Sequence, residues 1–151
     1  MKLAFGCDHG GFEAKEFVIR ILKNEGFDII DCGTDSIKSC DYPEFAFKAA
    51  ELVQKGEADK GILICSSGEG VSIAANKVKG IRCGIGYNDD VAHLIVEHNH
   101  CNMIAFGAKF MTNEEIYRRI KIFVKAQPEG DRHDRRVGLI DAYEAKEAKQ
   151  S

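Results

Sequence analysis

Short runs of apolar residues alternate along this chain with longer segments in which apolar positions recur every three or four residues. The runs fall at residues 2–5, 27–31, 60–65, 81–87 and 102–107. Several carry apolar residues on both faces of the predicted strand, a pattern typical of strands in a parallel sheet that is covered on both sides. We therefore predict five strands in one parallel sheet.

The segments between these runs have the periodicity of helices. Apolar stripes lie at residues 14–22, 45–53 and 116–124, with the i, i+3, i+4, i+7 spacing that places one helix face against a core. Regular alternation of strands and helices predicts an α/β fold, a three-layer α/β/α sandwich with right-handed crossovers.

The alternation ends near the C-terminus. Residues 126–138 contain Pro128, Gly130 and a charged cluster, and residues 139–151 resume a helical pattern. We expect residues 126–151 to form an arm and a final helix that pack on a partner subunit. A length of 151 residues suits one domain with a real core, so we assign residues 1–151 to a single domain.

Composition and charge exclude several classes of protein. Apolar residues make up 44% of the chain and charged residues 30%, which is ordinary for a globular protein, and the net charge is -3. An acidic chain is not drawn to nucleic acid or to an anionic membrane. No apolar run has the length of a membrane span or the pattern of a secretion signal. We expect a cytoplasmic protein that binds neither nucleic acid nor membrane.

Six cysteines are spread over the chain, at positions 7, 32, 40, 65, 83 and 101. They form no CxxC pair and no Cys/His cluster with the spacing of a zinc site. We expect free thiols and no structural metal site.

The sequence Cys-Ser-Ser-Gly-Glu-Gly at residues 65–70 joins a predicted strand to a predicted helix. Ligands of parallel α/β sheets bind at the carboxyl ends of the strands, and a glycine-rich turn there can direct its amides at an anion. Ordinary turn chemistry explains the same glycines and serines equally well. Cys65, at a helix N-terminus, fits a reactive thiol and a buried structural cysteine about equally.

Other candidate residues lie at different places in the predicted fold. Asp8 and His9 end the first strand at the same edge of the sheet, although Asp8 could simply cap a helix. His98 comes before the fifth strand, so it would reach that edge only from a neighbouring subunit or a long loop. Arg132 and Arg136 would share a helix face and suit a phosphate clamp, with a solvated charge cluster as the alternative.

Several segments together resemble the ribose-5-phosphate isomerase B family, which includes galactose- and allose-6-phosphate isomerases. They are FGCDHGG, DYP, GILICSSGEGVSIAANK, GIR, HNHCNMIAFG and RHDRRV, in order over residues 2–140. The resemblance implies a Rossmann-like domain that forms a homodimer or a dimer of dimers, with active sites at the dimer interface. It also implies aldose–ketose isomerisation of a small sugar phosphate through an enediolate, with no metal and no other cofactor.

The same resemblance implies roles for individual residues. Cys65 would move the proton between C1 and C2, Ser67 would help to transfer the hydroxyl proton, and His98 would open the sugar ring as a general acid. The substrate would be bound by Asp8, His9, Ser66, Ser67, Gly68, Glu69, Gly70, Asn99, Lys109, Arg132 and Arg136.

Three positions depart from the family pattern. Ser66 replaces a glycine common in this loop, Ser67 replaces a threonine, and Lys109 stands where some members have a phosphate-binding arginine. Lysine keeps the charge of arginine but lacks its bidentate fork. Some relatives use a glutamate from the loop instead of the cysteine; their glutamate aligns with Val71, so this chain is of the cysteine type.

We expect interconversion of ribose 5-phosphate and ribulose 5-phosphate. The nearest alternative is an allose- or galactose-6-phosphate isomerase on the same scaffold. A non-catalytic flavodoxin-like binding module would leave Cys65, His98 and the arginines unexplained. A cysteine hydrolase is a weaker alternative, because the sequence has no sign of a group that would orient a Cys–His pair.

Overall fold

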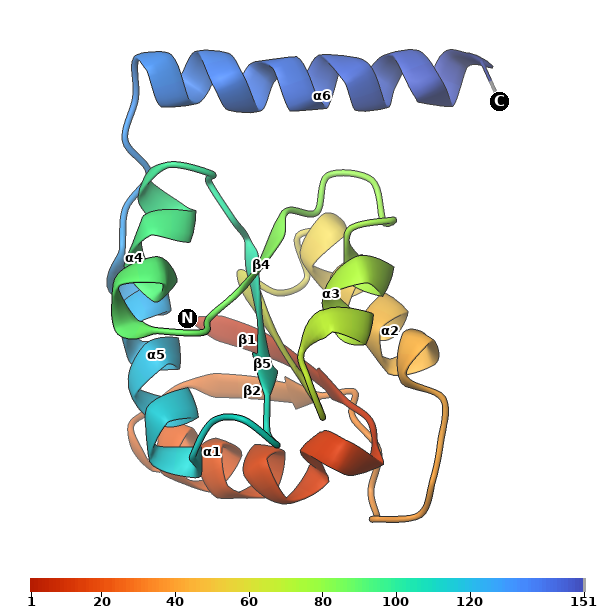
Figure 1. Ribbon diagram of the computed structural model, residues 1–151, viewed down its shortest axis with the longest axis vertical. Helices are drawn as coiled ribbons and strands as arrows, with labels where there is room; N and C mark the ends of the chain where they lie inside the picture. The colour runs from red at the N-terminus through yellow and green to blue at the C-terminus, as the bar shows by residue number, and fades with distance from the viewer. Residues whose placement is uncertain (151) are drawn as a thin grey trace.

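A parallel five-stranded sheet forms the centre of the computed structural model, which describes residues 1–150 (Figure 1). The strands are β1 (Lys2–Cys7), β2 (Asp28–Asp31), β3 (Lys60–Cys65), β4 (Cys83–Ile85) and β5 (Met103–Gly107), in the order β2-β1-β3-β5-β4. All five predicted strands are present. The assigned end of the domain and of its last helix, Ser151, lies outside the described residues.

Helices cover both faces of the sheet, which confirms the predicted α/β/α fold. They are the 3-10 turn η1 (His9–Gly11), α1 (Phe12–Asn24), α2 (Tyr42–Gln54), α3 (Glu69–Ala75), α4 (Asp89–Glu97), α5 (Asn113–Lys125) and α6 (Arg132–Gln150). Residues of α1, α4 and α5 share one buried cluster, and residues of α2 and α3 share the other. No helix within residues 1–150 is both long enough and apolar enough to cross a membrane.

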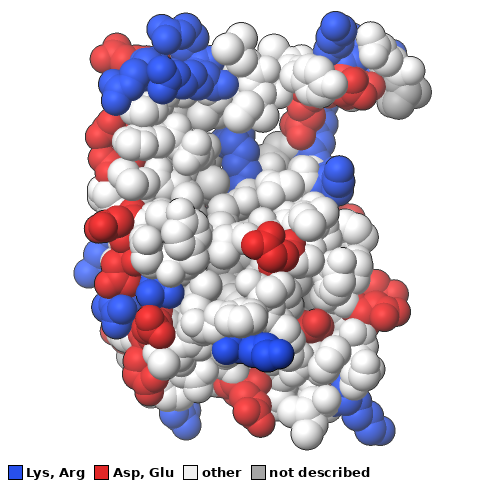
Figure 2. Space-filling model, in the orientation of Figure 1, with Lys and Arg blue, Asp and Glu red and all other residues white. Residues whose placement is uncertain are grey.

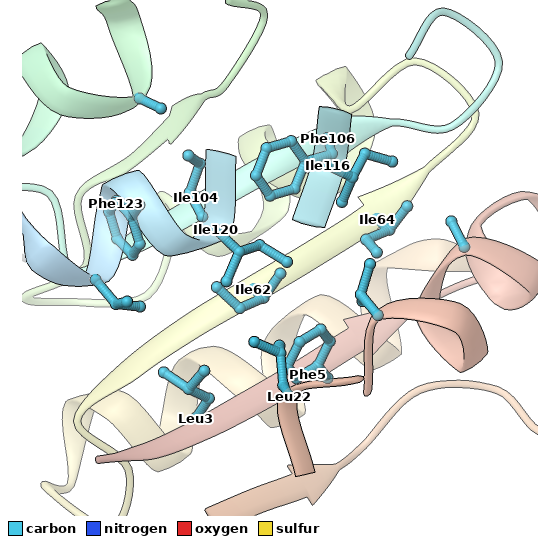
Figure 3. Packing of buried hydrophobic residues seen from close by; sticks show 14 of the residues in the cluster. Leu3, Phe5, Leu22, Ile62, Ile64, Ile104, Phe106, Ile116, Ile120 and Phe123 are labelled. Carbon is cyan, nitrogen blue, oxygen red and sulfur yellow. The ribbon is translucent and has the colours of Figure 1, made fainter. Parts of the chain in front are cut away.

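The two faces of the sheet are packed by side chains of different size. Large residues such as Phe5, Ile64 and Phe106 pack in one cluster with residues of α1, α4 and α5, and Figure 3 shows their side chains gathered over the strands. The opposite face is lined mainly by small residues, which let α2 and α3 approach closely. Because side chains alternate along a strand, Cys65 points to this second face, next to the start of α3.

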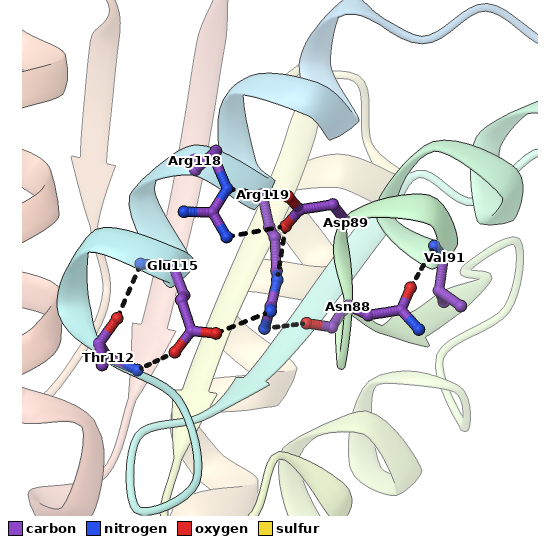
Figure 4. Close-up of polar contacts among 8 residues, drawn as sticks. Asn88, Asp89, Val91, Thr112, Glu115, Arg118 and Arg119 are labelled. Carbon is purple, nitrogen blue, oxygen red and sulfur yellow. Dashed lines mark hydrogen bonds and ion pairs between the residues drawn. The ribbon is translucent and has the colours of Figure 1, made fainter.

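A buried arginine joins α5 to the start of α4 (Figure 4). Arg119 of α5 donates hydrogen bonds to Asp89 at 3.1 Å, to Glu115 at 3.0 Å and to the Gly86 carbonyl at 3.3 Å. Thr112 caps α5 through a reciprocal hydrogen-bond pair with Glu115. These contacts hold the loops that follow β4 and β5, at the same edge of the sheet as Cys65.

The C-terminal segment differs from the prediction. The last helix begins at Arg132, so most of the charged cluster is helical, and only residues 126–130 are irregular. Pro128 and Gly130 interrupt the helical pattern only up to Asp131. This residue has a φ of 56°, in the left-handed region, and the chain enters α6 directly after it. In Figure 1 α6 lies across one end of the molecule, away from the sheet. Its Leu139 and Tyr143 are exposed.

Candidate active site

The loops that follow β1, β3 and β5 lie side by side at one edge of the sheet. β3 pairs with β1 on one side and with β5 on the other, and Cys65 is level with Gly107. The chain leaves β1 and β3 in opposite directions along the sheet, to β2 and toward β4. Such a switch in strand order opens a crevice at the carboxyl ends of the strands, where ligands of α/β proteins bind.

Cys65 is the last residue of β3 and lies at this edge of the sheet. Its side chain is buried, and its Sγ accepts a hydrogen bond from the Gly68 amide at 3.2 Å. That bond requires a sharp turn, in which Gly68 has a φ of 86°, a conformation that favours glycine. The Glu69 amide donates to Ser67 Oγ at 3.2 Å, so the hydroxyl proton of Ser67 is left for a bond to a ligand.

The loop after β5 braces the cysteine loop. The Ala108 amide donates to the Cys65 carbonyl at 2.9 Å, and the Lys109 amide donates to the Ser66 carbonyl at 3.0 Å. Gly107 lies so close to the Ser67 backbone that a side chain at position 107 would overlap it. The exposed Lys109 side chain therefore starts from a fixed point beside the cysteine loop.

Asp8 and His9 lie at the adjacent end of β1. Asp8 is buried and accepts the Gly10 amide at 2.9 Å, which is the capping role that the sequence left open as an alternative. His9 Nδ1 accepts the amide of Cys40 at 3.2 Å. Since a backbone amide only donates, the proton of a neutral His9 ring sits on Nε2, which is then available to donate to a ligand.

A buried lysine holds the loop that carries Cys40. The Lys15 side chain is only 2% exposed, and its Nζ donates to Asp31 at 2.9 Å and to the Thr34 carbonyl at 2.8 Å. Burial alone would lower the pKa of Lys15, but the hydrogen bonds and charge of Asp31 outweigh it, and the pKa is raised. Lys15 thus ties α1 to the end of β2, where this loop starts.

The tyrosine of the DYP segment is a site residue to which the sequence assigned no role. Tyr42 begins α2, and its ring carbon Cζ lies 2.7 Å from the point where a Cβ on Gly70 would stand. The ring therefore packs against the end of the cysteine loop, while Tyr42 as a whole is 39% exposed. Pro43, directly after it, was the available signal, because proline marks the first turn of a helix.

His98, Asn99, Arg132 and Arg136 lie elsewhere. His98 ends α4 and precedes β5, whose two ends are separated by four steps of about 3.3 Å each, or about 13 Å. The two arginines belong to α6, at the end of the molecule where Lys and Arg side chains gather in Figure 2. In a single chain these four residues do not meet the cysteine loop.

His98 and Asn99 contact residues of α6 and of the segment before β4. The His98 ring stacks on the ring of His133, with centroids 4.3 Å apart. Asn99 lines a cavity of about 390 Å³ together with Ile140 and Glu144 of α6. Arg82 holds this region by donating to the Asn99 carbonyl at 3.2 Å and to Asp141 of α6 at 3.2 Å.

These features define an α/β/α enzyme that binds a small substrate at the carboxyl edge of its sheet. A model of the ribose/galactose isomerase family matches residues 3–140. Ribose-5-phosphate isomerase B of Escherichia coli K12 is 43% identical over 143 residues, which cover 95% of this chain and 96% of that protein. The chain belongs to the ribose/galactose isomerase family.

Solved structures agree with this assignment. Ribose-5-phosphate isomerase B of Clostridium thermocellum superimposes with a TM-score of 0.95 at 42% identity, over 97% of this chain and 99% of that one. The enzyme from Mycoplasma genitalium, solved with bound ribulose 5-phosphate, gives a TM-score of 0.92 at 36% identity, over 95% of this chain and 96% of that one.

Proposed function

We propose that this chain interconverts ribose 5-phosphate and ribulose 5-phosphate, with Cys65 as the base that moves a proton between C2 and C1. Family membership supports the reaction class, an aldose–ketose isomerisation. The observation that carries the assignment of the base is the position of Cys65 Sγ, held by the Gly68 amide at the carboxyl edge of β3.

The mechanism follows from the loop. The Cys65 thiolate takes the proton from C2 of the open-chain aldose, and the electron pair left behind forms the C1–C2 double bond while O1 becomes an oxyanion. Backbone amides of the cysteine loop other than those of Gly68 and Glu69, which already donate to Cys65 Sγ and Ser67 Oγ, stabilise the developing charge. Ser67, whose hydroxyl proton is not used by the Glu69 amide, helps to move the proton from O2 to O1. The Cys65 thiol then returns its proton to C1, which gives the ketose.

The remaining substrate contacts come from both groups of residues. Asp8, His9 and Lys109 border the cysteine loop, and Tyr42 limits its far side. We assign ring opening to His98, a sugar contact to Asn99, and the phosphate to Arg132 and Arg136. Phosphate contacts remote from C1 and C2 supply binding energy that orients the reacting carbons.

Two copies of the chain then form each active site, in a homodimer or a dimer of dimers. The support is the separation within one chain, where His98 and the arginines lie at the opposite end of β5 from Cys65. The exposed Leu139 and Tyr143 on α6 offer apolar surface for a partner. Six unpaired thiols support the cytoplasm as the location, where thiols stay reduced.

An assay of the purified chain with ribose 5-phosphate tests the function. We expect Cys65→Ala to lower kcat by a factor of about 10²–10⁴. Cys32→Ala, a change at a half-buried cysteine away from the loop, is the matched control and keeps full activity. Full activity of Cys65→Ala would overturn the assigned base. A higher kcat/KM for allose 6-phosphate or galactose 6-phosphate would change the assigned substrate to a six-carbon sugar.

Mixing two inactive variants tests the shared site. Cys65→Ala and His98→Asn chains, unfolded together and refolded as a mixture, form mixed dimers with one intact site. We expect about a quarter of wild-type activity, because about half of the dimers are mixed and each has one of its two sites intact. A mixture as inactive as its components would place the whole site within one chain.

A further inference from the structure

Most of the histidines gather at one corner of the molecule. The chain has five, of which His93 lies in the middle of α4, His98 and His100 directly follow that helix, and His133 lies in the first turn of α6. Glu97 and Glu129 lie among them, and the Glu129 amide bonds to the Glu97 carbonyl at 2.9 Å. The proposed reaction uses only His98 from this cluster.

Three of these side chains have the spacing of metal ligands. Ligand atoms of His98, Glu129 and His133 all lie within 4.8 Å of one another, and His133 Nε2 is 3.5 Å from a Glu129 carboxylate oxygen. The two imidazole rings are nearly parallel, with an angle of 7° between their planes. One ring must therefore turn for both nitrogens to reach one ion, and His98, at the partly exposed end of α4, is the ring nearer to solvent.

An unsatisfied nitrogen points to a ligand at this place. The His133 side chain is about 95% buried, yet its Nε2 has no hydrogen-bond partner within residues 1–150. A buried polar atom without a partner is destabilising and uncommon in folded proteins. A cation bound between His133 and Glu129 would provide the missing partner.

The negative charge of Glu97, next to Glu129, also favours a cation at this place. Glu97 and Glu129 are neighbouring acidic groups, and their carboxylates repel each other when both are charged. His93 contacts Glu97 from the previous turn of α4. A dication would satisfy both carboxylates, with Glu97 able to support the liganding Glu129 from behind.

We propose that His98, Glu129 and His133 form a binding site for a divalent transition-metal ion of the Zn²⁺ type. Two imidazoles and one carboxylate are a donor set that Zn²⁺ prefers, with water completing a tetrahedral shell. In one respect this rests on the proposed function: because His98 is assigned as the ring-opening acid, an ion bound to its ring inhibits the isomerase. The ion is a ligand that competes for His98, not a cofactor.

Binding is tested without reference to activity. Side-chain nitrogen NMR of the full chain is followed during titration with Zn²⁺, and we expect the signals of His98 and His133 to change together, while His9 stays unchanged. Glu129→Gln should weaken the affinity at least about tenfold. Glu51→Gln, at an exposed glutamate on α2, is the matched control and leaves the affinity unchanged. Equal affinity in Glu129→Gln and the wild type would overturn the site.

Inhibition is tested in the isomerase assay. Glu129→Gln should keep the metal-free rate but need at least about tenfold more Zn²⁺ for the same inhibition. Zn²⁺ also binds thiolates, and inhibition at Cys65 would be equal in both proteins, an outcome that overturns the inhibitory role. If the chain lacks isomerase activity, the proposed function fails, and the NMR titration still decides the metal site.

Discussion

The backbone amide of Cys40 donates a hydrogen bond to Nδ1 of His9 across 3.2 Å, joining the loop after β2 to the turn after β1. We predict that neutral His9 carries its proton on Nε2. Nitrogen-15 chemical shifts of the neutral ring distinguish the two tautomers. A proton on Nδ1 would contradict this hydrogen bond and the donor role that we assign to Nε2.

Lys15 is expected to act on substrate binding from a distance, through the loop it holds. Lys15→Met removes the bonds to Asp31 and Thr34 and should lower the free energy of unfolding by about 1.5–3 kcal/mol. Because His9 and Tyr42 flank the loop, KM should rise several-fold while kcat changes less. Lys15→Arg keeps the charge and should restore part of the loss; unchanged KM in the methionine variant would limit Lys15 to a structural role.

Ser66 and Gly10 are expected to depend on each other. A Cβ at position 10 would overlap Ser66 Oγ, so Gly10→Ala should displace the cysteine loop and lower kcat/KM. Ser66→Gly removes that hydroxyl and returns the loop to the residue common in the family. We predict that Gly10→Ala combined with Ser66→Gly recovers activity relative to Gly10→Ala alone. Additive losses in the double variant would mean that the two positions are independent.

Buried thiols should resist alkylation in the native protein. Burial raises the pKa of Cys7 and of Cys83 to about 12 and that of Cys101 to about 11. At neutral pH they are almost entirely protonated, and the thiolate is the reactive form. Mass spectrometry after brief iodoacetamide treatment at pH 7 should find these three unmodified, and after unfolding all of them should react. Early labelling of Cys83 would contradict its buried position.

Acid should weaken the contact between α4 and α5. Hydrogen bonds from Arg118 and Arg119 lower the pKa of Asp89 below its ordinary 3.8. A carboxyl with a lowered folded-state pKa adds stability that is complete above its ordinary value and is lost as the pH falls through the folded value. Urea unfolding at about pH 3 and about pH 6 should show a smaller drop for Asp89→Asn than for the wild type. Equal drops would assign the acid sensitivity to other groups.

The sheet and its helices followed from periodicity, because each strand and helix has a local pattern that burial imposes. The position of β5 between β3 and β4 did not, since the order of strands depends on contacts between segments far apart in the sequence. The start of α6 was missed for a different reason. The interruption that Pro128 and Gly130 predict was extended to residue 138, whereas the arginines from Arg132 onward are good helix formers and α6 begins there.

The site could be predicted where its residues end strands. Asp8, His9, the cysteine loop and Lys109 are brought to one edge by the rule that parallel strands end together. No such rule predicts the positions of Cys40 and Tyr42 or the contact between His133 and Glu129, because these depend on the conformation of loops. The expectation that His98 needs a neighbouring subunit remains a prediction, which the mixing experiment tests.

The strand order has a consequence for synthesis on the ribosome. Within residues 1–150, β4 pairs only with β5, which is made after it. A nascent chain that ends before Met103 therefore leaves one edge of β3 open and β4 without a strand to pair with. Exposed strand edges promote association with other chains, so the growing polypeptide is most vulnerable until its last strand has emerged.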